Sequence, residues 1–103
     1  MIKEVNREEF KELAGRGLVL ADFFSTTCGP CKMLGFVLRD VEKEFGDNLT
    51  ILKVDFDQNR ELTEEYGVTG YPTLILFKNG EEAGRLQGLQ QKPVIVKLIE
   101  DNK

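Results

Sequence analysis

The chain has 103 residues, of which 41% are hydrophobic and 31% charged, and its formal net charge is −4 at pH 7. These values are typical of one soluble globular domain, and we expect residues 1–103 to form it. Basic and acidic residues are interleaved, which argues against a nucleic-acid-binding protein. No stretch reaches the roughly 20 apolar residues that cross a bilayer, and the polar N-terminus differs from a signal peptide. We therefore expect no membrane association and a cytoplasmic location.

The first half of the chain predicts two strand–helix units. Residues 2–5 predict a short edge strand, and Asn6 with Glu9 has the pattern of a capping box at the start of a short helix. The continuous apolar run at 18–24 is typical of a buried strand. Beyond it, apolar residues recur at helical spacing until about Phe45, which predicts a longer helix.

The second half of the chain alternates between strands and helices before ending in a hairpin and a helix. Residues 49–56 predict a strand, 59–66 a short helix and 73–78 another strand. Asn79-Gly80 is a strong hairpin signal, and it leads into a return strand at 82–87. Pro93 suits the first turn of a final helix.

These elements follow the order β-α-β-α-β-α-β-β-α. The βαβ units favour parallel pairing of the first three strands, and the hairpin adds an antiparallel pair. The strands at 18–24 and 49–56 are apolar on both sides, so helices must cover both faces of the sheet. The sequence therefore predicts an α/β fold, with a mixed five-stranded sheet flanked by four helices on both faces.

The only two cysteines, Cys28 and Cys31, are separated by Gly29 and Pro30 and lie where the predicted strand meets the long helix. Backbone N–H groups and the macrodipole at a helix start stabilise a thiolate. A closed zinc site needs four ligands, and the chain has no histidine, so we expect no metal. A cysteine pair in a cytosolic protein is more often catalytic than a structural link, so the motif points to thiol–disulfide exchange. Two inert buried thiols are the alternative.

Asp22 is an acidic residue inside the apolar run at 18–24. Its neighbours on both faces of the strand are apolar, so neither face offers water to a carboxylate. Burial should raise its pKa and make it a proton acceptor or donor near neutral pH. The alternative is a structural aspartate paired with Lys53 on the adjacent strand. Both can hold together, with Lys53 tuning the acid.

The sequence around these residues resembles the thioredoxin family. The stretch Asp22-Phe23-Phe24-Ser25-Thr26-Thr27-Cys28-Gly29-Pro30-Cys31-Lys32-Met33 matches the family's active site. A second hallmark is matched by Tyr71-Pro72-Thr73-Leu74 followed by Phe77-Lys78-Asn79-Gly80, and the register extends to Lys53-Val54-Asp55 and Gly88. The resemblance implies a thioredoxin fold, in a family known for a lowered pKa at its Cys-X-X-Cys thiols.

The same resemblance implies a protein-disulfide reductase. Its substrates would be disulfide-containing proteins, a thioredoxin reductase would recharge it, and it would need no cofactor beyond its redox-active Cys28–Cys31 disulfide. Cys28 would be the nucleophile and Cys31 the resolving thiol, with Gly29 and Pro30 shaping the loop between them. Asp22 would take the proton of Cys31 during resolution, through water. We expect a monomer.

A substrate-binding surface beside the cysteines is also implied by the resemblance. The family carries a cis peptide bond before the proline that corresponds to Pro72, facing the dithiol. The backbone of Tyr71 would then be free to pair with an extended substrate segment. Thr27 and Gly88 would belong to the same docking surface.

The chain departs from the usual thioredoxin pattern around the dithiol. It has no tryptophan: Thr27 precedes the first cysteine where the family usually has one, and Phe24 replaces another. Gly35-Phe36 stands where a helix proline is common, and Tyr71 is bulkier than the usual residue before the cis proline. These changes alter the surface and leave the thiols intact.

Two other functions are compatible with the residues. A disulfide oxidase or isomerase would need an export signal and a more oxidising active-site loop than Gly29-Pro30 is expected to give. A non-catalytic binding module would use the apolar surface around Cys28 without needing its sulfur.

Overall fold

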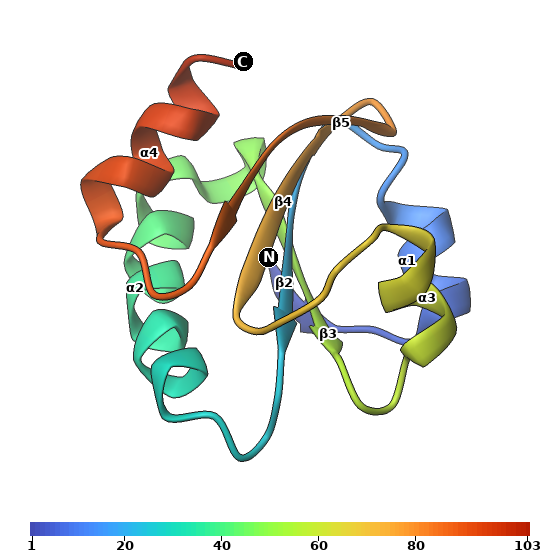
Figure 1. Ribbon diagram of the computed structural model, residues 1–103. Helices are drawn as coiled ribbons and strands as arrows, with labels where there is room; N and C mark the ends of the chain where they lie inside the picture. The colour runs from blue at the N-terminus through green and yellow to red at the C-terminus, as the bar shows by residue number, and fades with distance from the viewer.

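Five strands form one mixed sheet in the computed structural model, which describes all of residues 1–103 (Figure 1). In spatial order the strands are β1 (Ile2–Glu4), β3 (Thr50–Asp55), β2 (Leu18–Phe24), β4 (Thr73–Lys78) and β5 (Glu81–Gln87). Strand β3 pairs in parallel with β1 and β2, whereas β4 pairs antiparallel with β2 and β5. The predicted parallel core with an added antiparallel hairpin is confirmed.

Four helices cover the two faces of this sheet, as predicted. Helices α1 (Arg7–Leu13) and α3 (Arg60–Glu65) lie on one face, and α2 (Gly29–Phe45) and α4 (Lys92–Glu100) lie on the other (Figure 1). A short 3-10 helix at Gly46–Asn48 follows α2 and leads into β3. None of the helices has the length and apolar composition that crossing a membrane would require.

Local signals in the sequence account for where the elements begin and turn. Asn6 and Glu9 form the predicted capping box, with each side chain accepting a hydrogen bond from the backbone N–H of the other residue. Asn79 and Gly80 both have positive φ, at 50° and 88°, which suits the tight hairpin between β4 and β5. Several ends differ from the prediction by one residue, since the last residues of an element have the weakest pattern.

The sheet separates two buried layers of side chains. On the side of α1 and α3, the rings of Phe10, Phe23, Tyr66 and Phe77 pack against one another with centroids 5.4–6.3 Å apart. The side of α2 and α4 is packed mainly with leucine and isoleucine. Apolar residues of β2 contribute to both layers, because successive side chains of a strand point to opposite faces of the sheet.

One edge of the sheet gathers the segments that carry the predicted chemistry. Phe24 at the end of β2 is in register with Asp55 at the end of β3, and Phe23 is in register with Thr73 at the start of β4. The start of α2, the connection after β3 and the loop before β4 therefore meet at this edge.

Candidate active site

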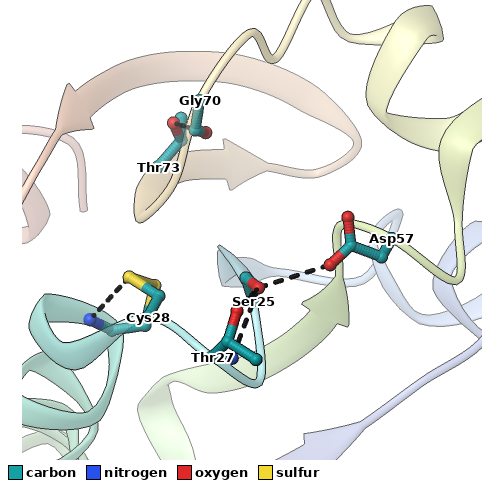
Figure 2. Close-up of a disulfide and its surroundings, with 7 residues drawn as sticks. Ser25, Thr27, Cys28, Asp57, Gly70 and Thr73 are labelled. Atoms are coloured by element: carbon teal, nitrogen blue, oxygen red, sulfur yellow. Dashed lines mark hydrogen bonds between the residues drawn. A yellow bond between two sulfur atoms is a disulfide. The ribbon is translucent and has the colours of Figure 1, made fainter.

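Cys28 and Cys31 form a disulfide at the start of α2, with their Cα atoms 5.2 Å apart (Figure 2). Cys28 is the N-cap residue, and its Sγ accepts a hydrogen bond from the backbone N–H of Cys31 at 3.1 Å. Gly29 and Pro30 occupy the first helical turn. N–H groups in that turn have no partner within the helix, so the lack of an N–H on Pro30 costs no helical hydrogen bond. The helix start thus directs a backbone donor at the sulfur of Cys28.

The two cysteines are more covered than the sequence alone suggests. Cys28 is 8% exposed and Cys31 is 4% exposed, whereas the nucleophile role that the resemblance implies for Cys28 would suggest an open sulfur. Both pack with Phe24 in a small apolar cluster, which is why little of either side chain reaches the surface. Thr27, Gly29 and Pro30 around them are exposed. A partner would therefore approach the disulfide across this exposed loop.

Asp22 is completely buried at the centre of the sheet, on the side of α2. Neither of its carboxylate oxygens has a hydrogen-bond partner. Burial raises the pKa of Asp22 to about 7, and the positive charge of Lys53 opposes that rise. The carboxyl group can therefore exchange a proton near neutral pH.

Lys53 does not form the ion pair with Asp22 that was one reading of the sequence. The two residues are direct neighbours in the β2–β3 register, yet the carboxylate of Asp22 has no partner. The Nζ of Lys53 lies instead 4.6 Å from the centre of the Phe24 ring. An aromatic face attracts a cation, so the side chain has an alternative to the carboxylate. Lys53 acts on Asp22 only through the charge that opposes its raised pKa.

The loop before β4 supplies an open backbone segment opposite the disulfide (Figure 2). The Tyr71–Pro72 peptide bond is cis, and Pro72 immediately precedes β4. Gly88 donates its N–H to the carbonyl of Pro72 at 2.8 Å, whereas the backbone N–H and C=O of Tyr71 make no hydrogen bond within the chain. A groove of about 180 Å³ runs along this loop, bounded on its other side by Gln87 and Gly88.

Tyr71 forms an aromatic pair beside this groove that the sequence did not reveal. Its ring is held edge-on against the ring of Phe56, with the centroids 5.3 Å apart. Tyr71 is nevertheless 45% exposed, so much of this residue is open to solvent next to Pro72. Phe56 directly follows β3, which is the only sequence signal for its place at this edge.

A chain of hydroxyl groups fixes the segment before Cys28 (Figure 2). Ser25 donates from Oγ to Asp57 Oδ2 at 3.3 Å, and the same Oγ lies 3.3 Å from Thr27 Oγ1. Because Ser25 has a single hydroxyl proton, Thr27 must donate in the second bond. The N–H of Thr27 also donates to Ser25 Oγ at 3.4 Å. Sequence analysis singled out Thr27 and missed Ser25 and Asp57, which follow the neighbouring strands β2 and β3.

No group of three or more cysteine, aspartate or glutamate side chains lies together as a set of metal ligands. The reactive groups on this part of the molecule are the disulfide and the buried carboxyl group of Asp22, and the backbone before β4 is open beside the disulfide. A cysteine pair of this kind exchanges disulfides through a thiolate and a mixed disulfide.

Comparison with known proteins agrees with this geometry. The thioredoxin family model matches residues 1–101. The chain is 48% identical over 99 residues to a thioredoxin of Chlamydia trachomatis, with 96% of each chain covered. It is 39% identical to a thioredoxin of Bacillus subtilis over 98 residues, covering 95% of this chain and 94% of the relative.

A solved structure is similar over nearly the whole chain. It is a mutant thioredoxin from Halobacterium salinarum, with a TM-score of 0.89 and 35% sequence identity over 97% of this chain and 88% of that one. The fold, the family match and the Cys28–Cys31 pair agree that the protein is a thiol–disulfide oxidoreductase with protein-disulfide reductase activity. The chain belongs to the thioredoxin family.

Proposed function

We propose that the protein reduces disulfides of other proteins by using Cys28 as the nucleophile and Cys31 as the resolving thiol. The thiolate of Cys28 attacks one sulfur of the substrate disulfide, a mixed disulfide forms, and the second substrate sulfur leaves as a thiolate. The observation that carries this assignment is the N-cap position of Cys28, whose Sγ accepts the backbone N–H of Cys31. The same donor and the helix dipole would stabilise a thiolate there.

Asp22 serves the second step in this proposal. Cys31 gives its proton to Asp22 through water, and its thiolate attacks the Sγ of Cys28. The Cys28–Cys31 disulfide forms, and the substrate leaves as a second thiolate that takes a proton from solvent. Two electrons have then passed from the protein to the substrate. Burial supports this role because it gives Asp22 a pKa of about 7, and Lys53 tunes that pKa downward.

Substrates dock across the exposed loop and the groove beside Pro72. The free backbone groups of Tyr71 pair with an extended substrate segment, as an added strand pairs with a sheet edge. Thr27 and Gly88 line the two sides of the bound segment. The lack of intramolecular hydrogen bonds at Tyr71 supports this arrangement, because an exposed donor and acceptor are available to a partner.

The oxidised protein needs two electrons to act again. We propose that a thioredoxin reductase supplies them, and that residues 1–103 work as one monomeric domain in the cytoplasm without a further cofactor. The family match supports a reductase partner and disulfide-containing protein substrates.

The direct test uses Cys31→Ser, which removes resolution and keeps the nucleophile. Incubated with a purified disulfide-bonded protein, this variant should accumulate a mixed disulfide through Cys28. The adduct is visible on non-reducing gels, and mass spectrometry of its peptides identifies the linked cysteine. A reducing agent should release it, because the link is a disulfide.

The matched control is Cys28→Ser, which keeps a thiol in the same helix turn. It should form little or no adduct, and the double variant none. Equal adducts from both single variants would overturn the assignment of roles. Full biological activity of Cys28→Ser in cells would instead favour a binding module that needs no thiol. A reduction potential well above the cytosolic glutathione poise would favour an oxidase or isomerase.

A further inference from the structure

Lys53 occupies an unusual position for a cation next to a buried carboxyl group. It is the direct neighbour of Asp22 across the β2–β3 pair, and it is only half-buried. Even so, both oxygens of Asp22 lack a partner, and Nζ of Lys53 lies 4.6 Å from the ring centre of Phe24. The ammonium group of Lys53 therefore contacts the aromatic ring of Phe24, where an ion pair with the carboxylate of Asp22 would be expected.

We propose that Phe24 is a positioning residue that holds the ammonium group of Lys53 over its ring and so keeps it from pairing with Asp22. The ring is well placed for this because it is only 8% exposed and packs against Cys28 and Cys31. A ring fixed by such packing presents one face to the lysine. A partly desolvated ammonium group over an aromatic face is held more strongly than one at a fully exposed site.

Besides Asp22, the charged residues that face Lys53 are Glu4, its register neighbour on β1, and Lys32 and Arg39 of α2, which line pockets together with it. Glu4 is exposed and forms no ion pair with Lys53. Of these charges, only that of Lys53 acts on the carboxyl group of Asp22. Cys31 of α2 is in the disulfide, and β4 contributes Leu74 in register with Asp22. Ile95 and Ile99 of α4 pack in the same layer. Within this buried layer, the ring of Phe24 and the carboxyl group of Asp22 are the two groups beside the ammonium group of Lys53.

This arrangement has a consequence for catalysis, which rests on the proposed role of Asp22 in resolution. A lysine bound to the carboxylate would keep Asp22 ionised and make it a weaker proton acceptor. A lysine held on the ring leaves the carboxyl group free to take up and release a proton in the pH range where the protein works. Phe24, which stands at a position where the family usually has tryptophan, thus sets the proton affinity of Asp22 through the lysine.

The first test is a pH titration of the oxidised protein, in which the cysteines do not titrate. The side-chain carboxyl carbon of Asp22 is followed by NMR in the unmodified protein, in Phe24→Leu and in Phe24→Tyr. Leucine removes the aromatic face, so the acid dissociation constant of Asp22 should rise about three-fold, the competition expected from a cation–π contact of ordinary strength. Tyrosine keeps the face and should leave the constant close to that of the unmodified protein.

The smaller leucine side chain would also lower the pKa of Asp22 if it admitted water to the carboxyl group. Lys53→Met separates this hydration effect from the release of the lysine. In a Lys53→Met background the ammonium group is absent, so Phe24→Leu should no longer change the titration of Asp22. The same rise with and without Lys53 would show that hydration is responsible and would overturn the proposal. An unchanged titration in Phe24→Leu alone would overturn it as well.

A second measurement needs no substitution near the disulfide. Protons on the ε-carbon of Lys53 should resonate upfield of their usual position, because the face of an aromatic ring shields them. Usual chemical shifts would contradict the contact. Both measurements are made on oxidised protein without turnover, so a failure of the Phe24–Lys53 proposal is distinct from a failure of mixed-disulfide trapping in Cys31→Ser.

Discussion

The two sides of the sheet are built from different side chains. The side under α1 and α3, the aromatic layer, contains no buried polar side chain without a partner, and its centre is a group of touching aromatic rings that includes Phe10 and Phe77. The side under α2 and α4 is packed with aliphatic side chains, and it also contains the buried, unpartnered carboxyl group of Asp22. The disulfide lies at the edge of this second side, at the start of α2.

The difference separates the part of the molecule that stabilises the fold from the part that carries the chemistry. Every side chain in the aromatic layer contributes burial without an uncompensated polar group. In the aliphatic layer, Asp22 costs stability whenever it is ionised, because burial penalises its charge. A residue with that cost is expected where a proton must be exchanged, so its place on the side of the sheet that α2 and the dithiol cover is consistent with catalysis.

The largest expected effect comes from removing a ring of the aromatic layer. Phe10 is completely buried and contacts the rings of Phe23, Tyr66 and Phe77. Phe10→Ala should lower the free energy of unfolding by about 3–5 kcal/mol, since it loses burial and leaves a cavity. Urea denaturation of the oxidised protein measures this loss.

An exposed phenylalanine on the other side provides the control. Phe36 on α2 is 64% exposed, so Phe36→Ala should change the free energy of unfolding by no more than about 0.5 kcal/mol. Folded Phe10→Ala should still reduce a disulfide substrate at the normal rate, because its layer does not contact the dithiol. Comparable losses in the two alanine variants, or a large loss of activity in folded Phe10→Ala, would contradict the division of roles.

The second prediction concerns the pH dependence that Asp22 gives to stability. Its pKa is about 7 in the folded protein, against about 3.9 in an unfolded chain, so between these values the folded state keeps a proton that the unfolded state has lost. The contribution of Asp22 to stability is therefore fully present below pH 4, decreases as the pH rises from 4 to 7, and is lost above pH 7. The loss attributable to Asp22 should be of the order of 4 kcal/mol by pH 8.

Asp22→Asn removes this titration, so the unmodified protein should lose stability relative to the variant as the pH increases. Unfolding curves of both proteins at pH 4, 6 and 8 give the difference in their free energies of unfolding. The contributions of the other titrating groups are the same in both proteins and cancel. The same variant should resolve mixed disulfides more slowly, since Cys31 then lacks its proton acceptor. A stability difference that does not change with pH would contradict a buried ionising Asp22, and an unchanged resolution rate would reduce it to a structural residue.

The sequence was sufficient to predict the fold because each element has a strong local pattern. The apolar run of β2, the capping box at Asn6 and the Asn79-Gly80 turn appear in the structure at the expected places. Asp22 was also identifiable, because an acidic residue in a strand that is apolar on both sides has to be buried. These features depend on residues close together in the chain.

What the sequence could not predict depends on the directions of side chains that come from different strands. Adjacency of Asp22 and Lys53 follows from the register of β2 and β3, yet the lysine turns to the ring of Phe24 instead of the carboxylate. The low exposure of Cys28 arises from the same ring. Pairing rules give neighbours in a sheet, whereas the choice among competing partners is decided by packing.

The smallest expected effect tests the link between the dithiol loop and the end of β3. Ser25 joins Thr27 to the carboxylate of Asp57 through hydrogen bonds of 3.3 Å. Ser25→Ala removes them, and because Asp57 is exposed its carboxylate is hydrated again. The loss in free energy of unfolding should be about 1 kcal/mol, the usual net value of such a bond.

Two neighbouring substitutions make this small effect interpretable. Asp57→Asn keeps an acceptor oxygen for Ser25 and should cost less than Ser25→Ala, whereas Thr26→Ala alters an exposed hydroxyl that makes no hydrogen bond and should be neutral. Urea denaturation of the oxidised variants compares all three. If Ser25→Ala proves as neutral as Thr26→Ala, the hydroxyl chain does not hold the loop. The position of Cys28 then depends on the helix start, the Phe24 ring and the hydrogen bond from the Cys28 N–H to the Ser25 carbonyl.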